Sequence, residues 1–177
     1  MPVYALDATG AAPKQAGSAN LVLNGTGARR GVTDFLYTAK LYLEHKTSNP
    51  DAVLKNTGTS QFRLVMLHDT SAAQMADLFS QGLEANASED DLVTLVSELF
   101  DVGVLLSEQG QLSAGDSFEI DAHPAAGTTL TLRSKVHSTP ITQTFANPRL
   151  FKAMMGIWLG DHPADPALKQ ALLGQSS

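Results

Sequence analysis

Apolar and polar residues alternate over residues 34–44, a pattern that predicts a strand with two unlike faces. The apolar face carries Phe35, Tyr37, Ala39, Leu41 and Leu43, and the other carries Thr38, Lys40, Tyr42 and Glu44. Similar alternation at residues 117–123 and 128–133, around a Pro-Ala-Ala-Gly turn, predicts a hairpin that continues through residues 141–145. A further strand is predicted at 61–68, and residues 20–23 lead into Asn24-Gly25, a dipeptide typical of tight hairpin turns.

Helical spacing dominates the middle and the end of the chain. Residues 70–85 repeat apolar side chains at helical intervals, and a second helix is predicted from Ser88, with Asp91 completing a capping box. The inner stripe predicted for this second helix is Leu92, Leu95, Val96, Leu99 and Phe100. A short helical turn is predicted at 49–55. Asn147-Pro148 and Asp165-Pro166 are each an N-cap followed by proline, and the last helix is expected to stop at Gly174.

The order of elements favours the α+β class. Strands come in runs and helices in pairs, which fits an antiparallel sheet with helices packed on one face better than a parallel sheet. Residues 1–19, rich in Ala, Gly and Ser, are expected to be a flexible lead-in with at most a short strand at residues 3–6. Residues 20–174 then form a single domain.

Composition excludes several classes of function. The net charge of −6 and pI near 5.2 argue against nucleic acid or an anionic membrane as partner. The absence of cysteine excludes disulfides and thiolate chemistry, and the five histidines lack metal-ligand spacing, so we expect no metal and no cofactor. We expect no membrane span, and the sequence leaves the oligomeric state open. The compartment is a bacterial periplasm if a signal peptide was removed, and otherwise the cytoplasm.

The main candidate for chemistry is Arg29, in the segment Leu-Asn-Gly-Thr-Gly-Ala-Arg-Arg-Gly at residues 23–31. Tyr37 points with the apolar set of the following strand. A guanidinium and a phenol that face one apolar cleft would bind a small anion. The alternatives are that Arg29 bonds carbonyl groups of the preceding turn and that Tyr37 is an ordinary core tyrosine.

Three stretches resemble the chalcone isomerase fold family, in particular its bacterial chalcone isomerase-like branch. They are residues 23–29, the run Tyr-Thr-Ala-Lys-Leu-Tyr-Leu-Glu at 37–44, and residues 151–174 with Gly-Ile-Trp-Leu-Gly-Asp. This resemblance implies an antiparallel sheet backed by helices, with an open ligand cleft between the two layers. The family includes true isomerases, fatty-acid-binding proteins and non-catalytic members.

The resemblance also implies roles for single residues. Arg29 matches the arginine that stabilises the anionic substrate of the isomerases, whereas Met75, Gly82 and Ile157 stand where those enzymes carry polar side chains. The fatty-acid-binding branch pairs the same arginine with a tyrosine, which Tyr37 matches when no gap is placed before Tyr42. The candidates for the lining of an apolar pocket are then Met75, Phe79, Ile157 and Trp158.

We therefore expect a non-catalytic protein that holds a small carboxylate-bearing amphiphile, such as a fatty acid, through Arg29 and Tyr37. The alternative is an isomerase that acts on a chalcone-like phenolic enone, with Arg29 as electrostatic stabiliser. A third possibility is a structural protein whose cleft has closed.

Overall fold

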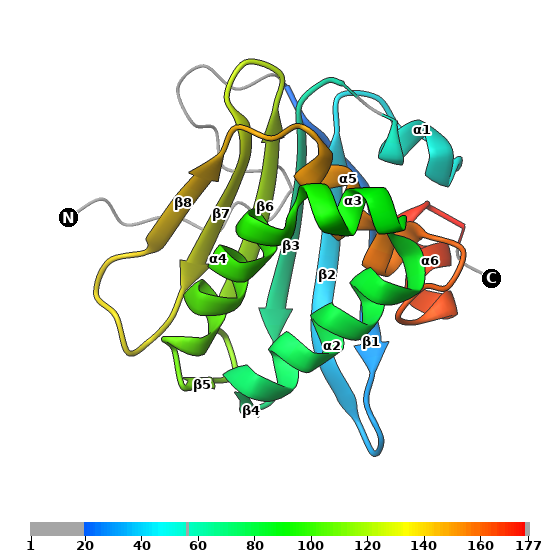
Figure 1. Ribbon diagram of the computed structural model, residues 1–177. Helices are drawn as coiled ribbons and strands as arrows, with labels where there is room; N and C mark the ends of the chain where they lie inside the picture. Colours follow the sequence, from blue (N-terminus) through cyan, green and yellow to red (C-terminus); the bar gives the residue numbers. More distant parts are fainter. Residues whose placement is uncertain (1–19, 56, 176–177) are drawn as a thin grey trace.

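A six-stranded antiparallel sheet forms one layer of the computed structural model, which describes residues 20–55 and 57–175 (Figure 1). The strands follow the order β1-β2-β3-β6-β7-β8 across the sheet. Their bounds are Val22–Arg30, Phe35–Leu43, Ser60–Met66, Ser117–His123, Gly127–Arg133 and Ile141–Phe145. A separate two-stranded ladder pairs β4 (Thr70–Ser71) with β5 (Gln111–Leu112).

The helices form the second layer. They are α1 (Pro50–Leu54), α2 (Ala72–Asn86), α3 (Glu89–Thr94), α4 (Val96–Ser107), α5 (Arg149–Leu159) and α6 (Pro166–Leu172). In Figure 1, α2, α3 and α4 lie in front of the sheet and α6 lies beside β1. Helix α5 is the central helix, because every one of its residues except Arg149 and Lys152 is buried. The predicted α+β fold with an antiparallel sheet is confirmed.

Local sequence signals explain where most of the elements begin. The side chains of Asn49, Ser88 and Asp165 accept hydrogen bonds from backbone N–H groups in the first turns of α1, α3 and α6, as N-cap residues do. Gly127 ends the predicted Pro-Ala-Ala-Gly turn with φ of 88°, a conformation that glycine adopts without strain. These three helix starts and the β6–β7–β8 meander were predictable from short segments alone.

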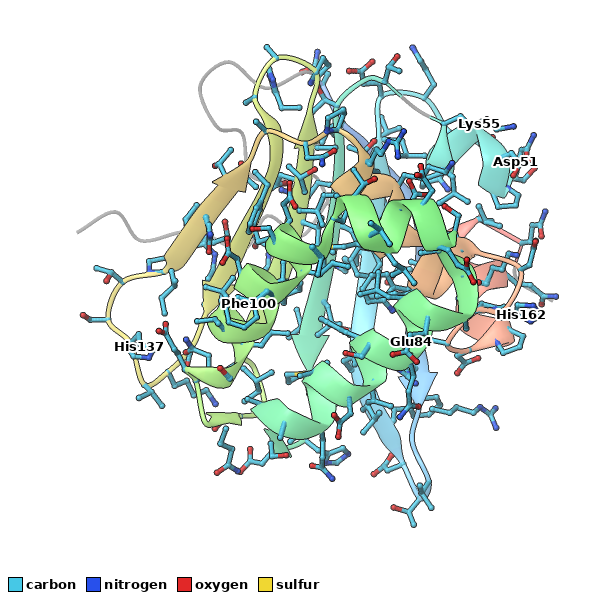
Figure 2. The ribbon with its side chains drawn as sticks, in the orientation of Figure 1. Asp51, Lys55, Glu84, Phe100, His137 and His162 are labelled. Carbon is cyan, nitrogen blue, oxygen red and sulfur yellow. The ribbon has the colours of Figure 1, made fainter. Side chains whose placement is uncertain are left out.

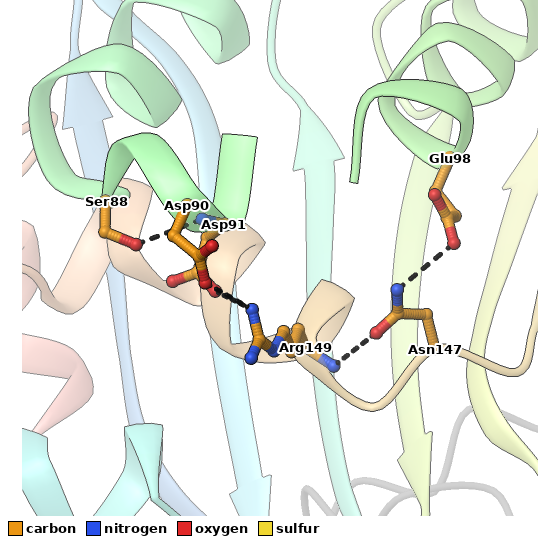
Figure 3. Close-up of polar contacts among 6 residues, drawn as sticks. All are labelled: Ser88, Asp90, Asp91, Glu98, Asn147 and Arg149. Carbon is orange, nitrogen blue, oxygen red and sulfur yellow. Dashed lines mark hydrogen bonds and ion pairs between the residues drawn. The ribbon is translucent and has the colours of Figure 1, made fainter. Parts of the chain in front are cut away.

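One helix start differs from the prediction and another has only half of its predicted cap, as Figure 3 shows. At Ser88, one bond of a capping box is present, from the Asp91 N–H to the Ser88 hydroxyl. Helix α5 begins at Arg149 with Pro148 in the N-cap position, one residue later than expected. The Asn147 side chain accepts from the Arg149 N–H and donates to Glu98, and the Arg149 guanidinium pairs with Asp90 at 2.8 Å. These contacts join α5 to the α3–α4 segment.

The hairpin turn predicted at Asn24-Gly25 is wrong. Strand β1 runs through both residues with a register shift, and the chain reverses at residues 31–34, where the Gly31 N–H bonds the Asp34 carbonyl. The Asn24 side chain donates to the carbonyls of Thr47 and Leu172 and accepts from the Thr47 N–H. An Asn-Gly pair therefore forms a bulge here, because its polar atoms are satisfied by distant backbone rather than by a turn.

The inner stripe predicted after Ser88 is wrong in two of its members. The helix divides at Leu95, which is fully buried, but Val96 is 66% exposed and Phe100 is 71% exposed. The side chains that α4 buries are instead Val102, Leu105 and Leu106. Helix α4 is apolar on both sides, and periodicity could not indicate which side faces the core.

Within residues 20–55 and 57–175, no helix has the length and apolar character needed to cross a membrane. The same residues contain no group of three or more His, Cys, Asp or Glu side chains placed to hold a metal ion. The lead-in at residues 1–19, with its possible strand at 3–6, lies outside the described residues.

Candidate functional site

The β1–β2 hairpin places Arg29 and Tyr37 directly opposite each other. The two residues are register partners, and both point toward the helical layer. Gly25 and Gly27 precede Arg29 on the same face, where a side chain would collide with α6: a Cβ on Gly27 would lie 2.8 Å from the Cβ of Ala171. The Gly-x-Gly spacing thus lets α6 pack on β1 and leaves Arg29 as the next side chain in the row.

The hydroxyl of Tyr37 forms hydrogen bonds with two side chains inside the core. Its oxygen accepts a hydrogen bond from Trp158 Nε1 at 2.9 Å and a longer one from Arg29 Nη1 at 3.4 Å. Tyr37 and Trp158 are both fully buried, whereas Arg29 is half-buried. A tyrosine hydroxyl has two acceptor positions and one hydrogen. Both acceptor positions are used, and no acceptor for the Tyr37 hydrogen is found among the described residues.

Burial raises the pKa of Tyr37, although the charge of Arg29 and the bond from Trp158 act in the opposite direction. The phenol therefore keeps its proton at neutral pH and has a hydrogen to donate to an acceptor.

Arg29 has no carboxylate partner within ion-pair distance in the described part of the chain. The nearest candidate on α6, Asp165, accepts instead from the backbone N–H of Arg30, at 3.0 Å, and caps α6. Burial of Asp165 acts to raise its pKa, but the bonds from the N–H groups of Arg30, Leu168 and Ala167 outweigh it and lower the pKa. The guanidinium of Arg29 thus has no ion-pair partner among the described residues and could bind an added anion.

The apolar candidates are packed core residues. Met75 is 1% exposed, and Ile157 and Trp158 are fully buried. The Trp158 ring lies 4.2 Å from the Phe62 ring and 5.6 Å from the Phe79 ring, measured between centroids. The structure therefore joins Arg29, Tyr37 and Trp158 by hydrogen bonds, whereas Met75 faces a gap shared with Met66 and Phe79, and Ile157 packs against Gly82 on α2. The hydrogen bond from Trp158 to Tyr37 could not be predicted from the sequence, because the two residues lie on separate elements 121 positions apart.

The open cleft expected from the resemblance is filled by side chains. A small cavity beneath α2 and α4 is lined by Met66, Met75, Phe79 and Phe118. Its volume of about 10 Å³ holds at most one water molecule. Gly82 and Ile157, which the resemblance aligns with polar positions of the isomerases, pack tightly on each other: a Cβ on Gly82 would lie 2.7 Å from Ile157 Cγ2. The core is close-packed at these residues.

A larger crevice lies elsewhere, between α1, α5 and the end of α2. Its volume is about 150 Å³, and its lining includes Asp51, Asn86, Lys152 and Asp161. No residue that the sequence indicated as a ligand contact lines it.

Comparisons with known proteins agree with this fold. The family model described as chalcone isomerase-like matches residues 7–174. The crystal structure of a fatty-acid-binding protein of Arabidopsis thaliana has the same fold, with a TM-score of 0.60 and 12% identity over 91% of this chain and 90% of that one. The search of curated proteins gave no match. Because the family match spans nearly the whole chain, the protein belongs to the chalcone isomerase-like family.

Proposed function

We propose that this protein binds a small carboxylate-bearing amphiphile, similar to a fatty acid, with the carboxylate held by Arg29 and Tyr37. One observation carries the proposal: the buried Tyr37 hydroxyl accepts two hydrogen bonds and has a hydrogen without an acceptor among the described residues. A carboxylate oxygen would accept that hydrogen, while the second oxygen would accept from the guanidinium of Arg29. The fatty-acid-binding protein with the same fold supports this class of ligand.

The tail of the amphiphile requires space that the closed core lacks. Met66 is the register partner of Tyr37 on β3, and Met75 faces the same gap from α2. Methionine side chains are unbranched and repack at low cost. Binding therefore involves movement of Met66, Met75 and Phe79, with Ile157 and Trp158 as the fixed wall behind the carboxylate.

The test is titration of the purified, delipidated protein with dodecanoate, measured by isothermal titration calorimetry. Arg29→Ala should weaken binding by about 2–3 kcal/mol, since it removes a charge-assisted bond. Arg30→Ala is the matched control, because Arg30 is the adjacent cation, is exposed, and should leave affinity unchanged. Dodecanol, which has no charge, should bind far more weakly than dodecanoate. Equal affinity for dodecanoate and dodecanol, or equal losses in the two arginine variants, would refute the carboxylate clamp.

Native mass spectrometry after expression in bacteria gives an independent measurement, in which co-purified fatty acid should be retained by the wild type and lost in Arg29→Ala. If no acid is retained and none binds on titration, the proposal is wrong. Conversion of a chalcone to a flavanone above background, abolished by Arg29→Ala, would replace it with the isomerase alternative.

A further inference from the structure

An apolar stripe lies on the solvent side of α3 and α4. Val93, Val96, Phe100 and Val104 are 75%, 66%, 71% and 39% exposed. Figure 2 shows Phe100 on the outer side of α4. Val96, Phe100 and Val104 follow one another at intervals of four residues, so at 100° per residue they lie within one quarter of the circumference of α4. They lie on the side of α4 away from its buried residues, and Val93 lies on α3, before the break at Leu95.

Gly103 lies beside the exposed side chains of α4. A Cβ on Gly103, next to Phe100 and Val104 on α4, would meet no atom within 4 Å among its surroundings. Glycine inside a helix costs stability relative to alanine, and no neighbouring atom requires it here. The space beside Gly103 is therefore open, next to the exposed Phe100.

The stripe is bordered by negative charge. Glu89 lies one turn before Val93, Glu108 lies one turn after Val104, and Asp101 flanks the middle. None of these three carboxylates has an ion pair with a described residue. From residue 64 to residue 132 the sequence contains no Lys or Arg, although this stretch holds twelve of the 18 acidic residues. The surface around the stripe thus combines exposed apolar side chains with three carboxylates that lack an ion pair, while Asp90 and Asp91 on α3 pair with Arg149.

From this combination we infer that the Val93–Val104 stripe is a docking surface for a basic amphipathic helix of a partner protein. The apolar face of such a helix would cover the four exposed side chains, and its Lys and Arg residues would meet Glu89, Asp101 and Glu108. A second copy of this chain fits poorly, because it would set two acidic borders against each other at a net charge of −6 per copy. Anionic lipid is disfavoured for the same reason.

The test uses a synthetic amphipathic helix of about 18 residues, built from Leu and Lys, which spans roughly 27 Å and so covers the stripe. Binding of the labelled peptide to the full chain is followed by fluorescence anisotropy. Phe100→Ala should weaken binding about tenfold, and Val136→Ala, at an equally exposed valine outside the stripe, should not change it. The triple variant Glu89→Gln/Asp101→Asn/Glu108→Gln should weaken binding by a similar factor.

Controls separate docking from general charge attraction. The variant Asp51→Asn/Glu84→Gln/Asp161→Asn removes the same number of exposed carboxylates outside the stripe and should bind like the wild type. A scrambled peptide of the same composition should bind weakly, and hydrogen exchange should slow only over residues 93–108 when the amphipathic peptide is bound.

Equal losses in the two triple variants, or no loss in Phe100→Ala, would overturn the inference. It would also be overturned by a dimer in sedimentation velocity that Phe100→Ala dissociates, or by binding to anionic vesicles. None of these readouts involves Arg29, so the test is independent of the proposed fatty-acid site.

Discussion

The hydrogen bond between Trp158 and Tyr37 should contribute measurably to stability, and Tyr37→Phe tests this. The substitution keeps the ring and removes the oxygen that accepts from Trp158 Nε1 at 2.9 Å. Because Trp158 is fully buried, its N–H is left without a partner, which costs about 1–3 kcal/mol. The lost bond from Arg29 adds little, since it is long at 3.4 Å and its donor is half-exposed. For a chain of this size, each kcal/mol lowers Tm by about 2–4 °C.

Urea unfolding followed by the fluorescence of Trp158, the single tryptophan, measures the loss directly. Tyr42→Phe is the matched control: Tyr42 is also buried, but its hydroxyl makes no hydrogen bond to a described residue. Its free energy of unfolding should change by less than about 0.5 kcal/mol. Equal, small losses in the two variants would show that the Trp158–Tyr37 bond is not stabilising. The argument for a Tyr37 hydroxyl fixed in position toward a ligand would then fail as well.

Three further predictions concern the scaffold. Gly25→Ala should destabilise the fold by at least about 2 kcal/mol in urea unfolding, because the new Cβ would collide with the backbone carbonyls of Ala171 and Leu172; a wild-type midpoint would contradict this packing. Gly103→Ala should raise the unfolding free energy by about 0.5–1 kcal/mol, since it improves helix propensity without a clash, and a loss would show a hidden constraint. Asp121→Asn should stabilise the protein at pH 7 by at most about 3 kcal/mol, because burial raises the pKa of Asp121 from 3.8 to about 6. The raised pKa means that the folded state favours protonated Asp121, so the wild type loses stability only as the pH rises from about 4 through 6. The free energies of unfolding of variant and wild type should therefore converge at pH 4, and a difference that persists there would contradict this.

Elements whose residues satisfy one another locally could be predicted from the sequence. The β6–β7–β8 meander follows from alternation and a Pro-Ala-Ala-Gly turn, and α6 begins where an Asp-Pro pair caps it. The alternation in β2 also placed Tyr37 on the inner face opposite Arg29, as the structure shows. Each of these features depends on interactions between residues a few positions apart.

Features that depend on distant partners could not be predicted in this way. Asn24-Gly25 has the composition of a turn, but the carbonyl of Leu172, 148 positions away, captures the Asn24 side chain and keeps the strand continuous. The two apolar sides of α4 give the same periodic signal, and only packing against α2 and the sheet decides that Phe100 faces solvent.

The sequence alone determined the α+β class, the pairing of Arg29 with Tyr37 on one sheet face, and the resemblance to a family with a carboxylate-binding branch. Tertiary structure decided that Tyr37 accepts a hydrogen bond from Trp158, that Met75 and Ile157 are buried in the core, and that α4 presents an apolar stripe to solvent. The physical reason is that backbone periodicity fixes the direction of a side chain relative to its own element. Its neighbours, and therefore its burial and its free hydrogen-bonding capacity, are set by elements that are distant in the sequence.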